Sequence, residues 1–458
     1  MYVAVKTRQQ VAAAGGEVTV DFYLINEKNV RGNHQLKISV TDSQGKVMEV
    51  GTYETEVAGG EVYGQLLVKD VKIPVPTAGG LCRIEAKLCK ENSVVTTGYD
   101  DILSVNLASN MLDGKGAVWE DGSALQNFLK GKTKEEVAAY EDNLGKLDWI
   151  MVARPPRKDQ LTMVPMEALR SADGKPGLDV VYYEDMEFQK EVYHEVAKVV
   201  NLSAIEGATP SPFVYMLDGY GIKWSGKVLP SVSGEYTIIP QSNDRSMIEV
   251  FVNGKKIYEI TRKKEHLGDG KVYLEGGKSA DIEIRFRHPR SNARCRLDWA
   301  VPNDKMPDAQ RLMERAVNDG TKIFIIQSAD EWSEFIAVNS KAVFKDKFFV
   351  GTNWLGGVMF NKPHDIFKEL PVGNALNWPY QALIHTGVER MGLVMEGEEL
   401  LVGAYHTYPM AIGTAMGIVP MGKGSVLFST LDIYGNIIND SAAGLVAKKL
   451  IFNMIDFK

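Results

Sequence analysis

The sequence has few cysteines, no long apolar run and no excess of basic charge. Only Cys82, Cys89 and Cys295 occur, too few for the disulfide framework that holds small secreted domains together. Without an uncharged apolar run of about eighteen residues, no membrane-spanning helix is expected. The net charge of −7 argues against nucleic acid and anionic membranes as partners. The first ten residues have no apolar core segment, so no signal peptide is expected.

What is present is the composition of an ordinary globular protein. The 458 residues, 45% hydrophobic and 24% charged, suffice for about three domains. Cys82 and Cys89 fall in one predicted strand at an odd spacing, which directs them to opposite faces and disfavours a bridge between them. We expect the cysteines to be small buried side chains.

Residues 2–106 show the alternation of a β-sandwich. Val18, Val20, Phe22 and Leu24 alternate with more polar residues, and Leu36, Ile38 and Val40 repeat this period of two. Turn residues separate such segments about every ten residues, which is typical of an immunoglobulin-like sandwich. We therefore predict this fold for residues 1–108.

The pattern then changes to strands alternating with helices. Apolar strands are predicted at 117–119 and 147–153, with a helix over 133–144 that begins at a capping box of Thr133 and Glu136. The pattern stops at Pro155-Pro156 and resumes after Pro302, with helices near 309–316 and 441–454 and strands at 322–326 and 426–430. Residues 109–175 and 304–458 are thus predicted to form one α/β domain with a parallel sheet.

The segment between these halves, residues 176–303, is predicted to be an inserted β module. It contains the strand 178–183, a Gly234-Glu235-Tyr236 strand start, a polar loop at 242–244, an Asn253-Gly254 hairpin turn and closing strands at 282–286 and 295–299. This pattern resembles the protective-antigen-type β-sandwich of many bacterial glycosidases and adhesins. The resemblance implies loops that approach sugars.

The other parts of the chain carry a second resemblance. Residues 20–27 and 60–67 of the predicted N-terminal sandwich resemble a sandwich of β-galactosidase-like enzymes of glycoside hydrolase family 2. Residues 363–371, 376–378 and 422–424 resemble the glutamine-amidotransferase-like, flavodoxin-like domain that closes such enzymes. The resemblance implies the C-terminal accessory region of such an enzyme, with a periplasmic or extracellular location.

The sequence features expected of a glycosidase or amidotransferase active site are missing. The sequence shows no series of strand–helix units for the barrel on which such enzymes hold two carboxyl groups about 5–5.5 Å apart. The predicted α/β segments contain no cysteine that could act as an amidotransferase nucleophile. No catalytic residue is therefore assigned, although a glycoside hydrolase with unrecognised carboxylates stays an alternative.

Four residues of the insert are the candidates for carbohydrate binding: Asn243, Asp244, Asn253 and Trp224. In calcium-dependent adhesins of the protective-antigen type, two consecutive Asp residues hold the ion that binds the sugar. Here the first position is Asn243, which removes one charge from a site that calcium prefers to be acidic. Two alternatives stay open: Asx side chains can satisfy a turn, and Trp224 can fill the core.

No cofactor or metal is predicted. The seven histidines are scattered without metal-ligand spacing, and His364 is expected to cap a turn. The predicted partners are an oligo- or polysaccharide and, through the α/β domain, a second copy of the chain. A calcium-dependent glycan-binding lectin is a further alternative.

Overall fold

The computed structural model describes residues 1–60, 62–91, 93–107, 111–156, 161–204, 219–242, 245–289, 293–302, 307–351, 357–384, 391–407, 410–438 and 442–457. The chain forms two compact units. The first unit contains Met1–Leu112, Asn361–Gln381 and Asn439–Lys458, and the second contains Asp113–Phe360 and Ala382–Ile438. No described helix is both long and apolar enough to cross a membrane.

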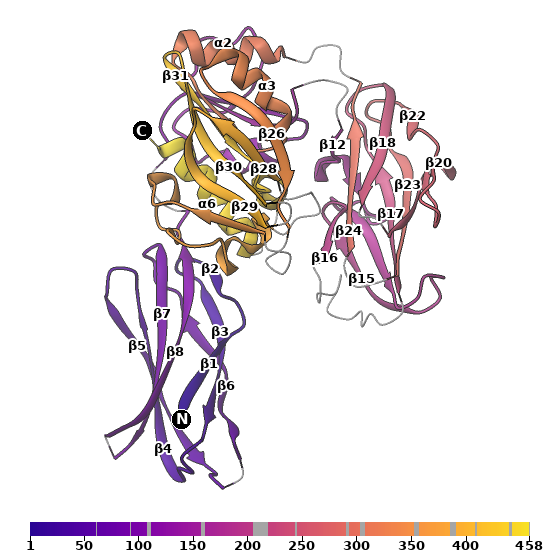
Figure 1. The fold of residues 1–458 in the computed structure, drawn as a ribbon. Helices are drawn as coiled ribbons and strands as arrows, with labels where there is room; N and C mark the ends of the chain where they lie inside the picture. Colours follow the sequence, from indigo (N-terminus) through magenta and orange to yellow (C-terminus); the bar gives the residue numbers. More distant parts are fainter. Residues whose placement is uncertain are drawn as a thin grey trace. The chain divides into compact units, whose positions relative to one another are not determined.

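The first unit is built on a β-sandwich (Figure 1). Its strands are β1 (Tyr2–Thr7), β2 (Val11–Ala13), β3 (Glu17–Ile25), β4 (Gly32–Thr41), β5 (Val47–Val57), β6 (Gly64–Pro74), β7 (Gly80–Lys90) and β8 (Ser93–Val105). They form one sheet in the order β1-β3-β6 and another in the order β2-β8-β7-β4-β5. The side chains predicted to face inward, such as Phe22 and Ile38, are fully buried, so the alternation is confirmed.

A close crossing inside this sandwich depends on Gly98 of β8. A Cβ atom at this position would lie 1.6 Å from the carbonyl oxygen of Val3 on β1.

The C-terminal helix α6 (Ala442–Asp456) and the short helices η3 (Asp365–Phe367) and η4 (Trp378–Tyr380) belong to the same unit. As predicted, His364 caps η3 by accepting the amide of Ile366. Lys449 of α6 donates to Glu369 at 2.6 Å.

The second unit contains a mixed sheet whose parallel part was predicted. We call strands β10 (Ala138–Ala139), β9 (Gly116–Glu120), β11 (Trp149–Ala153), β25 (Lys322–Ile325) and β31 (Gly424–Ser429) the parallel sheet, because they lie in this order and each pairs with its neighbour in parallel. Its helices are α1 (Ala124–Leu129), α2 (Ala309–Asp319), α3 (Ala329–Asn339), α4 (Gln381–Ile384) and α5 (Ile433–Ile437).

Two features of this region differ from the expectation. The sheet continues beyond β31 through strands that pair antiparallel: β30 (Met410–Met421), β28 (Met391–Glu396), β26 (Val343–Phe349) and β29 (Glu399–Thr407), with β27 (Val358–Asn361) beside β29. The helix predicted at 133–144 is wrong, because Thr133 donates to the carbonyl of Glu135 at 2.7 Å and Ala138–Ala139 join the sheet as β10. The flavodoxin-like assignment stays a prediction.

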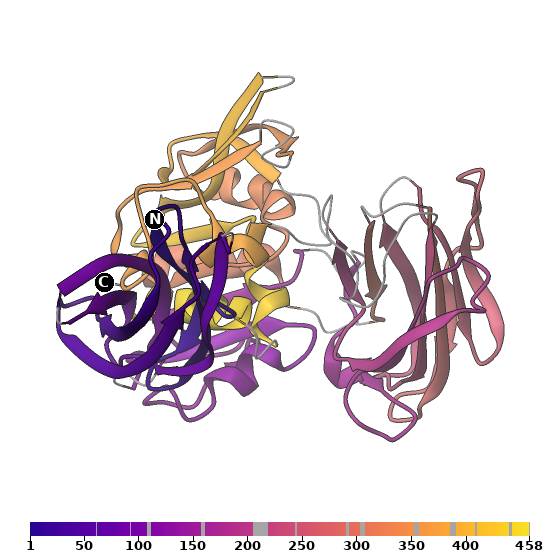
Figure 2. The ribbon, with the colours of Figure 1, turned by 90° about the horizontal axis from the view of Figure 1, so that it is seen from below.

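The inserted module consists of two sheets, and we call strands β12 to β24 the β-insert. One sheet contains β12 (Thr162–Met163), β24 (Ala293–Ala300), β18 (Gly234–Ser242), β22 (Lys271–Leu274) and β16 (Asn201–Ala204). The other contains β13 (Leu169–Arg170), β14 (Leu178–Tyr183), β15 (Glu191–Ala197), β17 (Tyr220–Val228), β19 (Met247–Val252), β20 (Lys255–Ile260), β21 (His266–Leu267) and β23 (Ala280–His288). Figure 2 shows the two layers, and aromatic residues are prominent in the core between them.

The cysteines are placed as expected. Cys82, Cys89 and Cys295 are all free thiols and all buried. Burial raises the pKa of Cys82 and of Cys295, which keeps both thiols protonated and unreactive. They act as small apolar side chains of the two sandwich cores.

Candidate functional site

The Asn253-Gly254 hairpin turn is confirmed, and it occupies the side chain of Asn253. The turn joins β19 to β20 with φ of 49° at Asn253 and 74° at Gly254, which is the left-handed conformation that a two-residue hairpin requires. Asn253 Oδ1 accepts a hydrogen bond from the backbone N–H of Asp281 at 2.9 Å. The backbone N–H of Asn253 donates to the Asp281 carbonyl oxygen at 2.8 Å. The side-chain oxygen therefore stabilises the scaffold.

Trp224 lies on β17 and faces the core of the β-insert. Its side chain is 3% exposed, and its ring packs edge-to-face on Phe286 with centroids 6.2 Å apart. The indole fills the core, the alternative that the sequence left open, and it is not presented to a ligand in this structure.

The other two candidates, Asn243 and Asp244, lie outside the described residues. Ser242 precedes them at the end of β18. Ser242 lines a polar pocket in the second unit. Ser242, the residue that directly precedes these two candidates in the sequence, is therefore part of a concave site.

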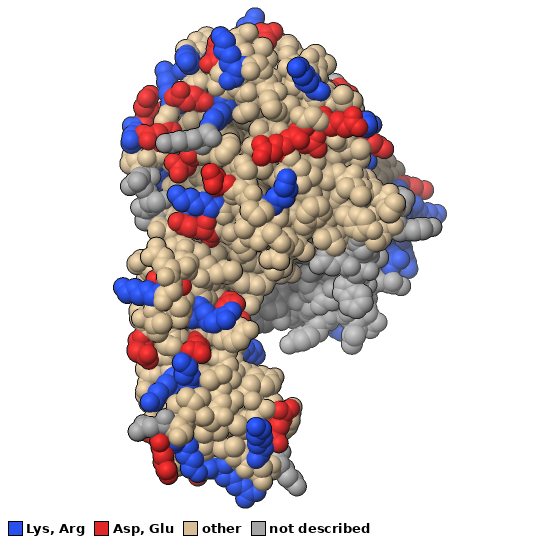
Figure 3. Space-filling model, turned by 60° about the vertical axis from the view of Figure 1, so that its left-hand side comes forward, with Lys and Arg blue, Asp and Glu red and all other residues tan. Residues whose placement is uncertain are grey.

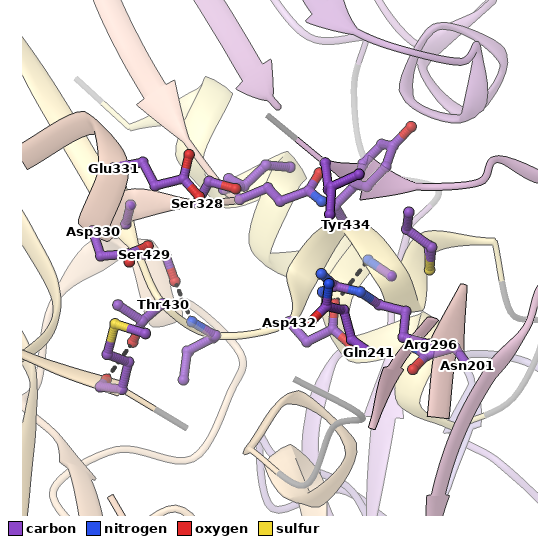
Figure 4. A pocket seen from close by; sticks show the side chains of 18 of the residues that line it. Asn201, Gln241, Arg296, Ser328, Asp330, Glu331, Ser429, Thr430, Asp432 and Tyr434 are labelled. Carbon is purple, nitrogen blue, oxygen red and sulfur yellow. Dashed lines mark hydrogen bonds between the residues drawn. The ribbon is translucent and has the colours of Figure 1, made fainter. Parts of the chain in front are cut away.

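This pocket has a volume of about 330 Å³, within the range of small-molecule sites. One side is formed by β-insert residues and the other by residues of the mixed-sheet region (Figure 4). The polar and charged lining residues are Asn201, Gln241, Ser242, Arg294, Arg296, Gln327, Ser328, Asp330, Glu331, Ser429, Thr430, Asp432 and Tyr434.

The pocket lies at the carboxyl ends of two parallel strands. Gln327 and Ser328 follow β25, and Thr430 and Asp432 follow β31. In open α/β sheets, ligands bind outside the carboxyl ends of the strands, where the connecting loops diverge. Strand β24 of the β-insert contributes Arg294 and Arg296. These residues are two positions apart, so both lie on the same face of the strand.

A buried ion pair supports the β-insert side of the pocket. Arg296 binds Asp298 through two hydrogen bonds of 2.6 and 2.5 Å, and the side chain of Asp298 is 1% exposed. Desolvation lowers the pKa of Arg296, but the charges of Asp298, Asp432 and Glu331 outweigh it and the pKa is raised. The guanidinium therefore stays charged and extends toward Asp432 (Figure 4).

Asp432 combines a structural role with a perturbed protonation equilibrium. One of its carboxylate oxygens accepts the amide of Gly435 at 3.0 Å, which caps helix α5. Desolvation raises the pKa of this carboxyl, against the opposing effects of Arg296, the Gly435 amide and Asn201. A carboxyl group with a raised pKa gains the ability to donate a hydrogen bond as well as to accept one.

The turn between β25 and α3 holds a strained backbone at the pocket. Ser328 has φ 55° and ψ 37°, and its side chain does not cap α3. The left-handed conformation costs a non-glycine residue about 1–2 kcal/mol, and such strain gathers at ligand-binding sites. Figure 4 shows Ser328 beside Glu331 at the pocket.

The arrangement is suited to binding a polar molecule. Asp330 is paired with Lys347 at 2.7 Å and Asp432 with the N-terminus of α5, so these carboxylates serve the scaffold. Among the described residues, no group of three or more His, Cys, Asp and Glu residues could hold a metal ion. Two arginines, three carboxamides and several hydroxyl groups instead offer donors and acceptors for hydrogen bonds.

Sequence reasoning missed this pocket because its residues are far apart in the chain. Asn201, Arg296, Ser328 and Asp432 come together only through the strand order. One signal could have found half of it. Gln327 and Ser328 follow the strand predicted at 322–326, and Asp432 follows the strand predicted at 426–430, where ligand-binding residues are expected.

Comparisons with known proteins match parts of the chain. The anti-sigma-I factor RsgI3 of Acetivibrio thermocellus is 28% identical over 127 residues, which are 27% of this chain and 19% of that protein. A β-glucosidase from Kluyveromyces marxianus is 12% identical, covering 49% of this chain and 30% of that chain with a TM-score of 0.34. A PA14 sugar-binding domain from an RTX adhesin is 14% identical, covering 27% of this chain and 88% of that domain with a TM-score of 0.23.

The chain thus spans only about a fifth of the first relative and under a third of the β-glucosidase. The glutamine-amidotransferase-like and family-2 assignments are not borne out by these matches and stay predictions. The family match is confined to one region. Residues 174–311 match the PA14 domain.

Proposed function

We propose that this chain is a carbohydrate-binding and structural accessory region of a β-galactosidase-like glycoside hydrolase, and that it binds glycans without cleaving them. The observation that carries the proposal is the PA14 match over residues 174–311, together with the position of Ser242. Ser242 lines the polar pocket and directly precedes the candidate residues Asn243 and Asp244 in the sequence.

A non-catalytic role is supported by the use of the acidic groups. The parallel strands of the described residues, β10, β9, β11, β25 and β31, lie in an open mixed sheet, whereas family-2 glycosidases aim their two carboxyl groups from a (β/α)8 barrel. In the pocket, Asp330 and Asp432 have the structural partners described above.

The proposed partner is an oligo- or polysaccharide. On the face in Figure 3, acidic and basic side chains are interspersed, with one row of acidic groups in its upper part. Such a face offers no basic stripe for nucleic acid. Self-association through the mixed-sheet region is part of the proposal, supported by Met410 and Ile412 of β30, which are 76% and 64% exposed.

The test is a glycan array probed with the purified chain, with and without EDTA. We expect binding that weakens in Asn243→Ala and Asp244→Ala and persists in Asp269→Ala, a matched change in the exposed segment between β21 and β22. Absence of glycan binding in the intact, folded chain would refute the proposed function. Loss of binding in EDTA together with Asp244→Ala would identify a calcium-dependent lectin.

Chromogenic galactosides test the enzymatic alternative, which the raised pKa of Asp432 in a pocket favours. We expect no turnover above that of buffer. Turnover that disappears in Asp432→Asn would show that the chain is a glycoside hydrolase in its own right.

A further inference from the structure

We infer that the pocket bounded by β24, β25 and β31 binds one end of the glycan as a neutral sugar residue, without a metal ion. This inference rests on the proposed function and goes further, because it assigns half of the binding site to the mixed-sheet region. In this arrangement Gln327, Ser328 and Asn201 contact the sugar directly.

Two amide oxygens in the pocket favour a hydroxyl-bearing ligand. Gln327 Oε1 and Asn201 Oδ1 are shielded from solvent and have no hydrogen-bond partner among the described residues. A shielded polar atom without a partner is unfavourable by about 1–3 kcal/mol. Hydroxyl groups of a sugar donate to such oxygens. The two amides come from opposite sides of the pocket, Gln327 from the turn after β25 and Asn201 from β16.

The charge distribution favours a neutral ligand. The charge of Arg296 is balanced by Asp298 at 2.5 Å, and that of Asp330 by Lys347 at 2.7 Å. An added anion would meet Asp330, Glu331 and Asp432, and an added cation would meet Arg294 and Arg296. A molecule with hydroxyl groups and no charge avoids both costs.

Arg296 also explains why no metal is needed. Its guanidinium interacts with the charges of Asp298, Asp432 and Glu331, and its side chain is 16% exposed. The guanidinium of Arg296 is permanently charged and therefore compensates the negative charge of these carboxylates, as a bound cation would.

The size and backbone of the site agree with one sugar residue or two. A volume of about 330 Å³ is at the lower end of the range for ligand pockets. Ser328, held at φ 55° with a side chain that does not cap α3, places a hydroxyl group at the pocket instead of at the helix end. A strained residue at a polar pocket is expected where ligand contact requires it.

The experiment measures binding of methyl β-D-galactoside, methyl β-D-glucoside and methyl α-D-mannoside to the full chain in EDTA by titration calorimetry. The charged probes are methyl β-D-glucuronide and inorganic phosphate. We expect one neutral glycoside to bind and both charged probes to bind at least about tenfold more weakly, because an unpaired charge is costly to bury.

Two variants test the assigned residues. Gln327→Met keeps the side-chain length but removes the amide, and Ser328→Gly removes the hydroxyl while suiting the positive φ. Each is expected to weaken glycoside binding about five- to tenfold, the effect of one lost hydrogen bond. Gln35→Met, the same change at a half-buried position of the first unit, is the control and keeps full affinity.

The outcomes separate this inference from the proposed function. Unchanged affinity in both pocket variants, loss of binding in EDTA, or tighter binding of a charged probe would overturn the pocket assignment. If the chain binds glycans on the array but none of the three neutral glycosides, the pocket assignment is overturned and the proposed function is unaffected. Thermal unfolding of each variant shows whether it is folded, and Ser328→Gly keeps the test decisive if Gln327→Met is unstable.

Discussion

The two β-sandwiches of this chain share an architecture but differ in what they bury. The first has an almost purely aliphatic core, and one of its ion pairs, between Arg83 and Asp101, is exposed on the surface. The β-insert has a core rich in Tyr and Trp and places Asp298, bound to Arg296, in its interior. Charge inside a domain opposes folding unless it is paired. The first sandwich also buries a carboxylate, Asp21, but its partner Arg8 is 44% exposed. Arg296 is only 16% exposed, so the β-insert carries the larger desolvation cost. The residues that carry this desolvation cost lie next to the pocket.

The largest test of this comparison removes the buried carboxylate. Asp298→Asn leaves Arg296 without its ionic partner in a largely desolvated site, and we expect the β-insert to lose about 3–5 kcal/mol of unfolding free energy. The matched change Asp101→Asn breaks the exposed pair of the first sandwich and is expected to cost under about 1 kcal/mol. Urea unfolding measures both, and equal losses would remove the distinction between the two sandwiches.

A steric test addresses the first sandwich. Gly98→Ala introduces a Cβ atom 1.6 Å from the Val3 carbonyl oxygen, so β1 and β8 must move apart. We expect a loss of about 1–3 kcal/mol, typical of overpacking. Gly45→Ser, in a turn of the same sandwich where a Cβ atom meets nothing within 4 Å, separates the steric effect from backbone strain. A smaller loss for Gly98→Ala than for Gly45→Ser would contradict the close crossing.

The hairpin of the β-insert gives a smaller effect. Asn253→Ala removes the hydrogen bond to Asp281 and places alanine at φ 49°, so we expect a loss of about 1–2 kcal/mol. Asn253→Gly keeps the turn conformation and should recover part of the loss. If Asn253→Gly is stable yet binds glycan more weakly, the side chain contacts the ligand as well as the scaffold.

The smallest effect is a change in pH dependence. Because the pKa of Asp432 is raised by desolvation, the folded chain holds this proton more tightly than the unfolded chain does. Its contribution to stability is therefore greatest below the ordinary pKa of an aspartate and falls as the pH rises through the folded pKa. Asp432→Asn is expected to flatten this decline, measured by thermal unfolding as the pH rises above the ordinary aspartate pKa of about 4. A steeper decline of stability with pH in the variant would contradict a raised pKa of Asp432.

The sequence predicted what local periodicity determines. The alternation around Phe22 and the apolar run of Ile323 gave correct strands, and the Asn253-Gly254 turn was read from its residue types. The helix at 133–144 failed because pairing of Ala138 with β9 outweighed a local capping signal. The pocket was beyond prediction because Arg296 and Asp432 meet through the strand order and not through spacing.

The path of the chain through the β-insert has a consequence for how the protein folds. Residues 154–321 separate β11 from β25, although these strands pair directly. The two ends of the β-insert also meet, since Thr162 pairs with Trp299. If the β-insert folds first, it draws its own ends together and shortens the open loop that must close before β11 and β25 can join, which lowers the entropic barrier to that step. The β-insert would thus also act as an internal template for the sheet that completes the pocket.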